Sequence, residues 1–155
     1  TAYEISTRDW SSDVCSSDLA DGASSYYVDC YNSSPASLLD AAEAFDRLTR
    51  ADAAPRLFLL GGMAELGPTS ARLHRDCGAR LPLRPGDHVV AFGGESAEFL
   101  QGVALPGVRL SPAVSVEEAA ALVAAHRGPV FLKGSRSFAL ERCLPAGLRA
   151  ALAFH

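Results

Sequence analysis

The 155-residue sequence has no long apolar run and no cluster of cysteines. Its apolar stretches fall well short of the roughly 18 residues that a membrane-spanning helix needs. Four cysteines (Cys15, Cys30, Cys77 and Cys143) are scattered along the chain, without the close pairs typical of a zinc site or a disulfide framework. This usage suits the reducing cytosol. We therefore expect a cytoplasmic protein with no membrane segment and no metal ligands of its own.

Residues 1–19 lack any hydrophobic period. They carry the string DWSSDVCSSDL (Asp9 to Leu19), which holds two Ser-Ser-Asp repeats and the only tryptophan. The string resembles the conceptual translation of a sequencing adapter, and TAYEI (Thr1 to Ile5) resembles another part of the same oligonucleotide in the same frame. We predict that residues 1–19 are a non-native, disordered segment and exclude them from fold reasoning. The alternative is a natural disordered arm rich in Ser and Asp.

The charge balance of the remaining chain is close to neutral. Without the four acids and one base of residues 1–19, the 18 acids and 14 bases of the sequence become 14 and 13. This gives no electrostatic reason to expect a nucleic acid or a membrane surface as partner. The sequence also lacks G-x-x-x-x-G-K-[ST], so it has no P-loop of its own. Residues 20–155 have the length of one domain with one core.

Short apolar runs alternate with helical patterns from residue 24 to residue 144. The predicted strands are Ser24–Cys30, Arg56–Leu60, His88–Phe92 and Pro129–Lys133, with Gly107–Leu110 as a short edge strand. The predicted helices are Pro35–Arg50, Ser70–Leu81, Ser96–Gln101, a helix after Ser115, and Phe138–Leu144. This alternation indicates βαβ units. We predict a single α/β domain with a Rossmann-like, mostly parallel sheet and helices on both faces.

Two helix starts have recognisable capping residues. Ser34 is placed to cap the first helix, with Pro35 at the first helical position, where its missing N–H costs nothing. Ser115 and Glu118 have the spacing of a capping box.

In parallel sheets, ligands bind beyond the carboxyl ends of the strands, and three of the loops that follow strands carry polar groups. The first, DCYNSSP (Asp29 to Pro35), brings a carboxylate, a phenol and an amide to a strand end. Asp29 could accept the hydroxyls of a ribose, and Tyr31 and Asn32 could shape a nucleotide site. The alternative is that Asp29 and Asn32 only shape the turn and cap the helix.

The loop after the last strong strand, KGSRSFALE (Lys133 to Glu141), combines Lys133, Ser135 and Arg136 with a helix start. Two cations and free backbone N–H groups are suited to bind an anion. The alternative is two solvated surface charges and a capping serine.

The loop GGMAELG (Gly61 to Gly67) and the helix after it supply two weaker candidates. Glu65 could face a ligand, but the loop taken alone favours a simple glycine-rich connection with Met63 and Leu66 in the core. His74 lies in the following helix, where a lone histidine is more often packed than catalytic.

The three loops together resemble the C-terminal domain of the Mur ligase family, and within it the MurF type. The resemblance rests on D-C-Y-N-S-S-P, on L-G-G-M-A-E-L-G followed by His74, and on L-K-G-S-R followed by Glu141, in that order and spacing. The family usually has Asp at the position of Gly62, so this chain lacks a polar side chain there.

This resemblance implies a three-domain, ATP-dependent peptidoglycan-precursor ligase whose first two domains are missing from this chain. Such enzymes phosphorylate the carboxylate of UDP-N-acetylmuramoyl-tripeptide and then let the amine of D-Ala-D-Ala attack the acyl phosphate. A central domain holds most of the ATP and the Mg²⁺, and the C-terminal domain closes over them. Asp29, Tyr31 and Asn32 would then bind nucleotide, and Lys133, Ser135 and Arg136 would bind the dipeptide or phosphate.

The resemblance also implies that residues 20–155 alone contain no catalytic residue. We expect the isolated domain to be an inactive monomer. Two alternatives stay open: another amide ligase of the Mur or folylpolyglutamate type, and a stand-alone Rossmann-like module that binds a nucleotide or a partner.

Overall fold

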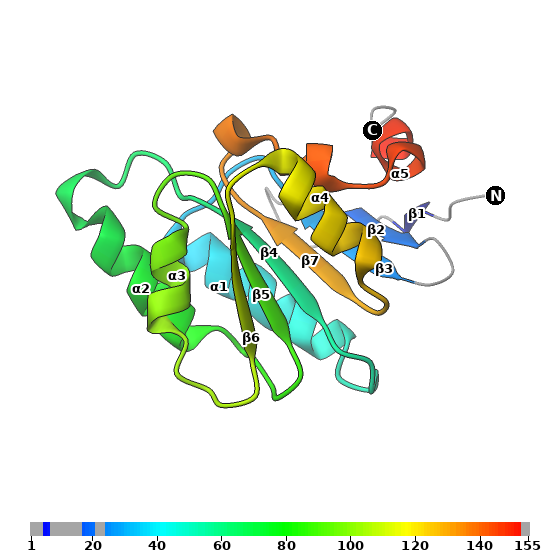
Figure 1. The fold of residues 1–155 in the computed structure, drawn as a ribbon, viewed down its shortest axis with the longest axis horizontal. Helices are drawn as coiled ribbons and strands as arrows, with labels where there is room; N and C mark the ends of the chain where they lie inside the picture. The colour runs from blue at the N-terminus through cyan, green and yellow to red at the C-terminus, as the bar shows by residue number, and fades with distance from the viewer. Residues whose placement is uncertain (1–4, 7–16, 21–23, 153–155) are drawn as a thin grey trace.

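The computed structural model describes residues 5–6, 17–20 and 24–152. These residues form one seven-stranded sheet in the order β1-β2-β3-β7-β4-β5-β6 (Figure 1). The strands are β1 (Ile5–Ser6), β2 (Ser17–Ala20), β3 (Ser25–Asp29), β4 (Leu57–Gly61), β5 (His88–Phe92), β6 (Arg109–Ala113) and β7 (Val130–Lys133). The helices are α1 (Pro35–Leu48), α2 (Ser70–Arg80), α3 (Ala97–Gly102), α4 (Val116–Ala125) and α5 (Ala146–Leu152). Three 3₁₀ turns, η1 (Gly67–Thr69), η2 (Arg136–Phe138) and η3 (Leu140–Cys143), complete the set.

Five strands of the sheet are parallel: β3, β7, β4, β5 and β6, in sheet order. This confirms the predicted Rossmann-like sheet. Strand β7 is the last of the five in the sequence, but it lies between β3 and β4, which are the first two. Consequently the loop after β7 lies between the loops that follow β3 and β4. Strand order cannot be read from a single sequence, and this insertion is what brings the three predicted loops together.

The edge of the sheet differs from the prediction. Within residues 1–19 we expected disorder, yet β2 pairs antiparallel with β3, and β1 pairs antiparallel with β2. A strand edge offers a row of unpaired N–H and C=O groups, so an adjoining segment can pair with it through backbone alone, whatever its side chains. Residues 1–4 and 7–16 lie outside the described residues, and the adapter origin of the segment stays a prediction.

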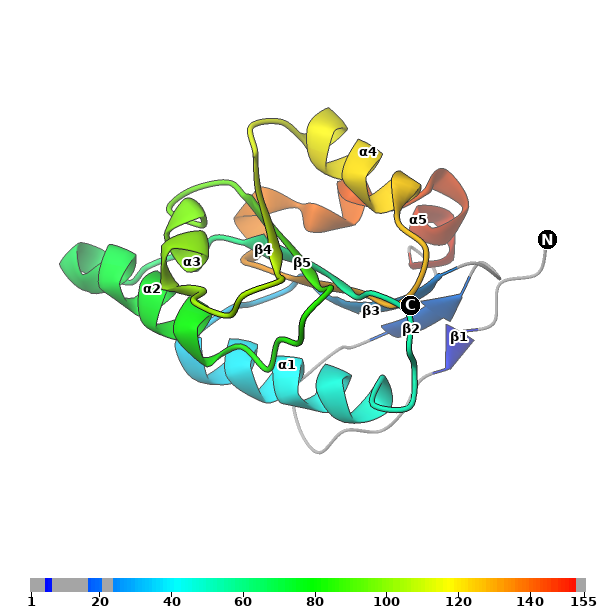
Figure 2. The ribbon, with the colours of Figure 1, turned by 60° about the horizontal axis from the view of Figure 1, so that its bottom comes forward.

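Helices cover both faces of the sheet, as predicted. Figure 2 shows α1 below the sheet and α4 and α5 above it. Side chains alternate along each strand, so Leu57 and Leu59 face the α4 side while Phe58 and Leu60 face the α1 side, and all four are fully buried. Because both faces are covered, the parallel strands read as continuous apolar runs.

The α1 side of the core contains a cluster of aromatic rings. Tyr27, Phe45, Phe58 and Phe131 contact one another with ring centroids 5.3–6.2 Å apart. Among the described residues, no helix is both long and apolar enough to cross a membrane.

The predicted caps form, with one difference. Ser34 caps α1, its hydroxyl and that of Ser37 each accept from the other's backbone N–H, and Pro35 occupies the first helical turn. At α4 the Ser115 hydroxyl accepts from the Glu118 N–H at 3.1 Å, as expected. The Glu118 carboxylate, however, accepts from Val114 N–H at 2.8 Å, so the reciprocal bond reaches one residue further back than in a capping box.

The prediction of a helix over Phe138–Leu144 is wrong. The chain forms η2 and η3, separated by Ala139 in the left-handed region at φ 48°. Phe138 and Leu140 both pack inward, whereas two residues of a continuous α-helix so spaced would point about 200° apart. The break at Ala139 resolves that conflict. Helix α5, which follows, was not predicted.

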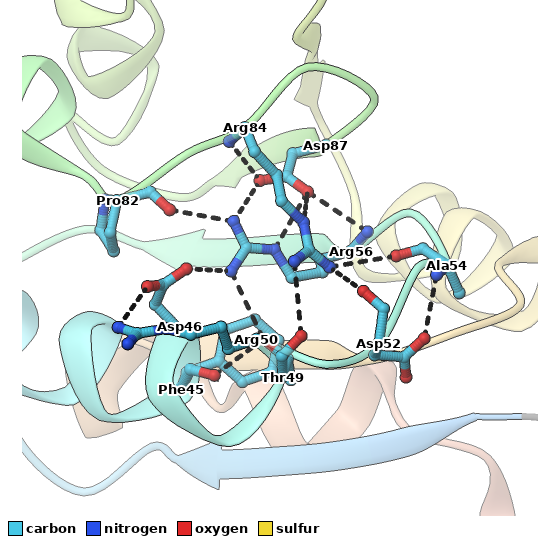
Figure 3. Close-up of polar contacts among 10 residues, drawn as sticks. All are labelled: Phe45, Asp46, Thr49, Arg50, Asp52, Ala54, Arg56, Pro82, Arg84 and Asp87. Carbon is cyan, nitrogen blue, oxygen red and sulfur yellow. Dashed lines mark hydrogen bonds and ion pairs between the residues drawn. The ribbon is translucent and has the colours of Figure 1, made fainter.

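A buried charge cluster joins the sheet to α1 at the amino ends of β4 and β5, opposite to the predicted site (Figure 3). The fully buried Arg56 pairs with Asp87 through two hydrogen bonds and with Asp46 at 2.7 Å. It also donates to the carbonyl oxygen of Pro82 and lies 5.3 Å above the centre of the Phe58 ring. Burial by itself would lower the pKa of Arg56, but the hydrogen bonds and charges of Asp87 and Asp46 outweigh it and raise the pKa.

Candidate functional site

The loops that follow β3, β4 and β7 meet at the carboxyl ends of these neighbouring strands. We call them together the carboxyl rim, defined as residues 29–35, 61–67 and 133–138. Asp29 and Lys133 are register partners at the last rung between β3 and β7. Because β3 and β7 are neighbours and parallel, Asp29, Lys133 and the loop that carries Arg136 lie at the same end of the sheet, as predicted.

Asp29 and Lys133 bind each other inside the rim. The Lys133 Nζ lies 2.7 Å from the Asp29 Oδ2 and donates a second bond of 2.7 Å to the backbone oxygen of Asn32. Lys133 is 1 % exposed and Asp29 is 4 % exposed. Since each charge is neutralised by the other, neither is presented to solvent as a free ligand-binding group.

The exposed polar residues of the rim are Tyr31, Asn32, Glu65, Arg136 and Ser137, and the first two lie on the same turn. Tyr31 is 69 % exposed, and the Arg136 guanidinium carbon lies 5.4 Å from the centre of its ring. An aromatic face, an amide and a guanidinium thus stand together on the surface. Such a set can stack on a planar group and bind a phosphate or a carboxylate.

Ser135 connects the loop after β7 to the loop after β4. Its N–H donates to the Gly62 oxygen at 3.1 Å, and its hydroxyl accepts from the Ser137 hydroxyl at 3.2 Å. The backbones of Gly61 and Gly134 approach so closely that a side-chain carbon at Gly134 would lie 2.7 Å from the Gly61 Cα. Glycine at both positions is what allows the two loops to touch.

The two weaker candidates, Glu65 and His74, differ in their exposure to solvent. Glu65 is exposed at the tip of its loop, in the left-handed region at φ 61°. His74 is fully buried: its Nε2 accepts from the Met63 N–H at 2.9 Å, and its Nδ1 lies 2.7 Å from the Ser70 oxygen. These bonds require the proton on Nδ1. His74 therefore ties the loop after β4 to α2 and does not face the rim surface, and Met63 is in the core, as the alternative interpretation expected.

Phe138 is a rim residue that the sequence reasoning did not single out. Its ring lies against Gly62, Gly93 and Gly94, with Gly93 and Gly94 at φ 80° and 57°. A side-chain carbon at Gly62 would lie 3.0 Å from both this ring and the Gly93 oxygen. The Gly93-Gly94 pair in the sequence was a signal for this contact, since both glycines are needed to accommodate the ring.

The cysteine near the rim is not an activated nucleophile. Burial raises the pKa of Cys30, and the charges of Glu141 and Asp29 raise it further. Burial likewise raises the pKa of Cys143 to about 11. Both thiols are therefore protonated at neutral pH. Within residues 24–152, no three His, Cys, Asp or Glu side chains gather in a way that could hold a metal ion.

These features define a class: an α/β domain of the Rossmann-like kind, with a rim built from three loops at the carboxyl ends of adjacent parallel strands. The family model described as "Mur ligase, glutamate ligase domain" matches residues 18–136. The chain belongs to this family.

The known relatives agree with this assignment. The chain is 33 % identical, over 126 residues, to the UDP-N-acetylmuramoyl-tripeptide–D-alanyl-D-alanine ligase of Treponema pallidum, covering 77 % of this chain and 27 % of that protein. The MurF ligase of Thermotoga maritima, solved in complex with ADP, matches with a TM-score of 0.63 and 24 % identity over 81 % of this chain and 28 % of that one.

A third relative is the UDP-N-acetylmuramoylalanyl-D-glutamyl-2,6-diaminopimelate–D-alanyl-D-alanyl ligase of Acinetobacter baumannii. It matches with a TM-score of 0.60 and 26 % identity, over 89 % of this chain and 28 % of that one. The chain thus spans little more than a quarter of the length of each of these three relatives.

Proposed function

We propose that this chain is the C-terminal domain of an ATP-dependent ligase that joins D-Ala-D-Ala to UDP-N-acetylmuramoyl-tripeptide. The observation that carries the proposal is the meeting of Tyr31, Asn32 and Arg136 on one rim, built from loops far apart in sequence. The similarity to the Treponema pallidum ligase supports the substrate class.

In the proposed reaction, the γ-phosphoryl group of ATP moves to the tripeptide carboxylate and ADP leaves. The amine of the dipeptide then attacks the acyl carbon, the C–O bond to phosphate breaks, and the amine loses a proton. The acyl phosphate must be shielded from water, which closure of this domain over a neighbouring one would provide.

The rim groups have distinct proposed tasks. Tyr31 and Asn32 contact the nucleotide, and Arg136 binds a phosphate or the dipeptide carboxylate, helped by Ser135. Glu65 lies at an exposed loop tip, where it can meet the neighbouring domain. Asp29 and Lys133 were predicted to touch ligand directly, but their mutual burial favours a supporting role for both.

The ATP phosphates and Mg²⁺ need groups that the described residues do not gather. The sequence has no P-loop, and the described residues offer no cluster that could hold a metal ion. We therefore propose that a domain outside this chain holds both, and that the chain by itself neither turns over substrate nor binds ATP strongly.

The test uses the longer parent protein and the 155-residue chain side by side. The parent is assayed for ADP release with UDP-N-acetylmuramoyl-tripeptide and either D-Ala-D-Ala or single amino acids as acceptors. We expect turnover with D-Ala-D-Ala alone, and none from the 155-residue chain. Preference for a single amino acid would indicate another Mur or folylpolyglutamate-type ligase, and a parent without any ligase activity would support the binding module.

A further inference from the structure

The turn that carries Tyr31 and Asn32 has few bonds of its own. Residues 31–33 lie between the end of β3 and the cap of α1, and they belong to neither element. Outside the sheet and the helices, the described residues make one hydrogen bond to the backbone of this turn, from Lys133 Nζ to the Asn32 oxygen at 2.7 Å. Ser33 is buried, and its hydroxyl has no partner among the described residues.

Lys133 makes this bond together with its ion pair to Asp29. It extends from the end of β7, the strand beside β3, and its ammonium group is 1 % exposed. Asp29 accepts from the same nitrogen, so the positive charge is compensated within the rim. A buried, compensated cation has little remaining attraction for a phosphate, whereas the exposed Arg136 on the same loop keeps its charge available.

We propose that Lys133 is a positioning residue, which fixes the turn of Tyr31 and Asn32 in its ligand-contacting shape and does not itself touch substrate. The Asp29 carboxylate compensates the charge of the buried Lys133 ammonium. The Asn32 oxygen accepts the hydrogen bond that holds the turn in place. This inference rests on the proposed function in one respect, the contact of Tyr31 and Asn32 with the nucleotide. The effect of Lys133 on the order of the turn does not depend on that contact and can be tested without any ligand.

The first test measures backbone ¹⁵N relaxation in the 155-residue chain, comparing the unchanged chain with D29N/K133M. Lys133→Met alone would leave a buried, unpaired carboxylate, and Asp29→Asn alone would leave a buried, unpaired ammonium, so either single change endangers folding. The unchanged chain has the lysine donor for the Asn32 oxygen, so we expect its residues 31–33 to be ordered, with order parameters of about 0.85. In D29N/K133M we expect values below about 0.6 at these residues.

A cavity variant controls for a general loss of stability. Leu57 is fully buried at the amino end of β4, far from the rim, so L57A should destabilise the chain and leave residues 31–33 ordered. Unchanged order at residues 31–33 in D29N/K133M, or the same loosening in L57A, overturns the proposal.

The second test compares the unchanged parent ligase with its D29N/K133M variant. If the turn is correctly shaped for a tenth of the time, the apparent affinity for nucleotide falls about tenfold. We therefore expect KM for ATP to be about tenfold higher in D29N/K133M, with kcat nearly unchanged. A fall in kcat at constant KM would place Lys133 at the reacting phosphate and overturn the proposal. Loosening of the turn without any kinetic change would instead contradict the proposed nucleotide contacts of Tyr31 and Asn32.

Discussion

Arg56 and Asp87 form a two-point ion pair at the amino ends of β4 and β5. Arg56 Nε lies 3.1 Å from Asp87 Oδ1, and Arg56 Nη2 lies 2.6 Å from Asp87 Oδ2. Asp87 also accepts from the Arg84 N–H at 2.8 Å. Figure 3 shows that the cluster draws on α1, on the start of β4 and on the segment before β5. Because this cluster lies at the opposite end of the sheet from the carboxyl rim, we infer that its role is to stabilise the fold.

Arg56→Met should therefore destabilise the fold strongly. The change leaves Asp87 buried without its main partner, and breaking a buried pair from one side typically costs about 3–5 kcal/mol. Urea unfolding of the 155-residue chain measures this. Arg72→Met is the control, since Arg72 pairs with Asp76 on an exposed surface and should not change the midpoint measurably. A midpoint for R56M equal to that of the control would disprove the structural role.

His74→Phe should loosen the loop after β4. Phenylalanine keeps a ring in the buried site but cannot accept from the Met63 N–H, and an unsatisfied buried donor costs about 1–3 kcal/mol. We expect lower stability together with faster hydrogen exchange at the Met63 amide. If H74F were as stable as the unchanged chain while the parent ligase lost activity, His74 would have a catalytic role instead.

Two glycines next to Phe138 should respond differently to alanine. Gly62→Ala places a carbon 3.0 Å from the Phe138 ring and the Gly93 oxygen, a crowding that typically costs about 1–3 kcal/mol. Gly93→Ala meets the same ring and is also strained by its φ of 80°. In a Phe138→Ala background, the penalty for G62A should shrink, whereas G93A should keep its strain. Equal recovery of the two variants, measured by chemical denaturation, would contradict this account.

His88 should make the fold less stable in acid. Burial, and then the charges of Arg109 and His126, lower the pKa of His88 from 6.5 to about 4, and its Nε2 contacts the Ser111 hydroxyl at 2.8 Å. Between these two values the unfolded chain binds more protons than the folded one, so stability falls as pH drops from 6.5 to 4. The loss attributable to His88 is on the order of 3 kcal/mol.

The measurement compares unfolding free energies of the unchanged chain and of His88→Gln between pH 7.5 and 4. Glutamine can still contact Ser111 but does not titrate, so the variant should lose less stability over this range. Burial also lowers the pKa of His126, which adds a loss common to both proteins. Parallel curves for the two proteins would refute the contribution of His88.

Arg136→Met in the parent ligase should weaken ligand binding without affecting the fold. Arg136 is exposed, and the loss of a hydrogen bond to a charged group typically costs about 1.5–3 kcal/mol, or roughly ten- to a hundredfold in affinity. We expect a higher KM for ATP or for D-Ala-D-Ala and an unchanged midpoint of unfolding for the 155-residue chain. If both KM values were unchanged, the proposed contact of Arg136 with a ligand would be wrong.

The pattern of the sequence was sufficient for most of the elements. Apolar runs placed β4, β5 and β7 within a residue or so of their observed bounds, because strands buried on both faces read as continuous apolar runs. Ser34 and Pro35 located the start of α1 because capping is a local interaction. The stretch from Phe138 to Leu144 was misread because its two inward side chains follow from packing against the sheet and not from helical periodicity.

The sequence by itself determined the alternation of strands and helices, the family, and which loops carry polar groups, since each of these depends on neighbouring residues or on motif spacing. Only the tertiary structure decided that β7 lies between β3 and β4. It also decided that Lys133 turns inward onto Asp29 and Asn32 while Arg136 stays exposed. The reason is that strand order and burial depend on contacts between residues about a hundred positions apart, which local patterns do not encode.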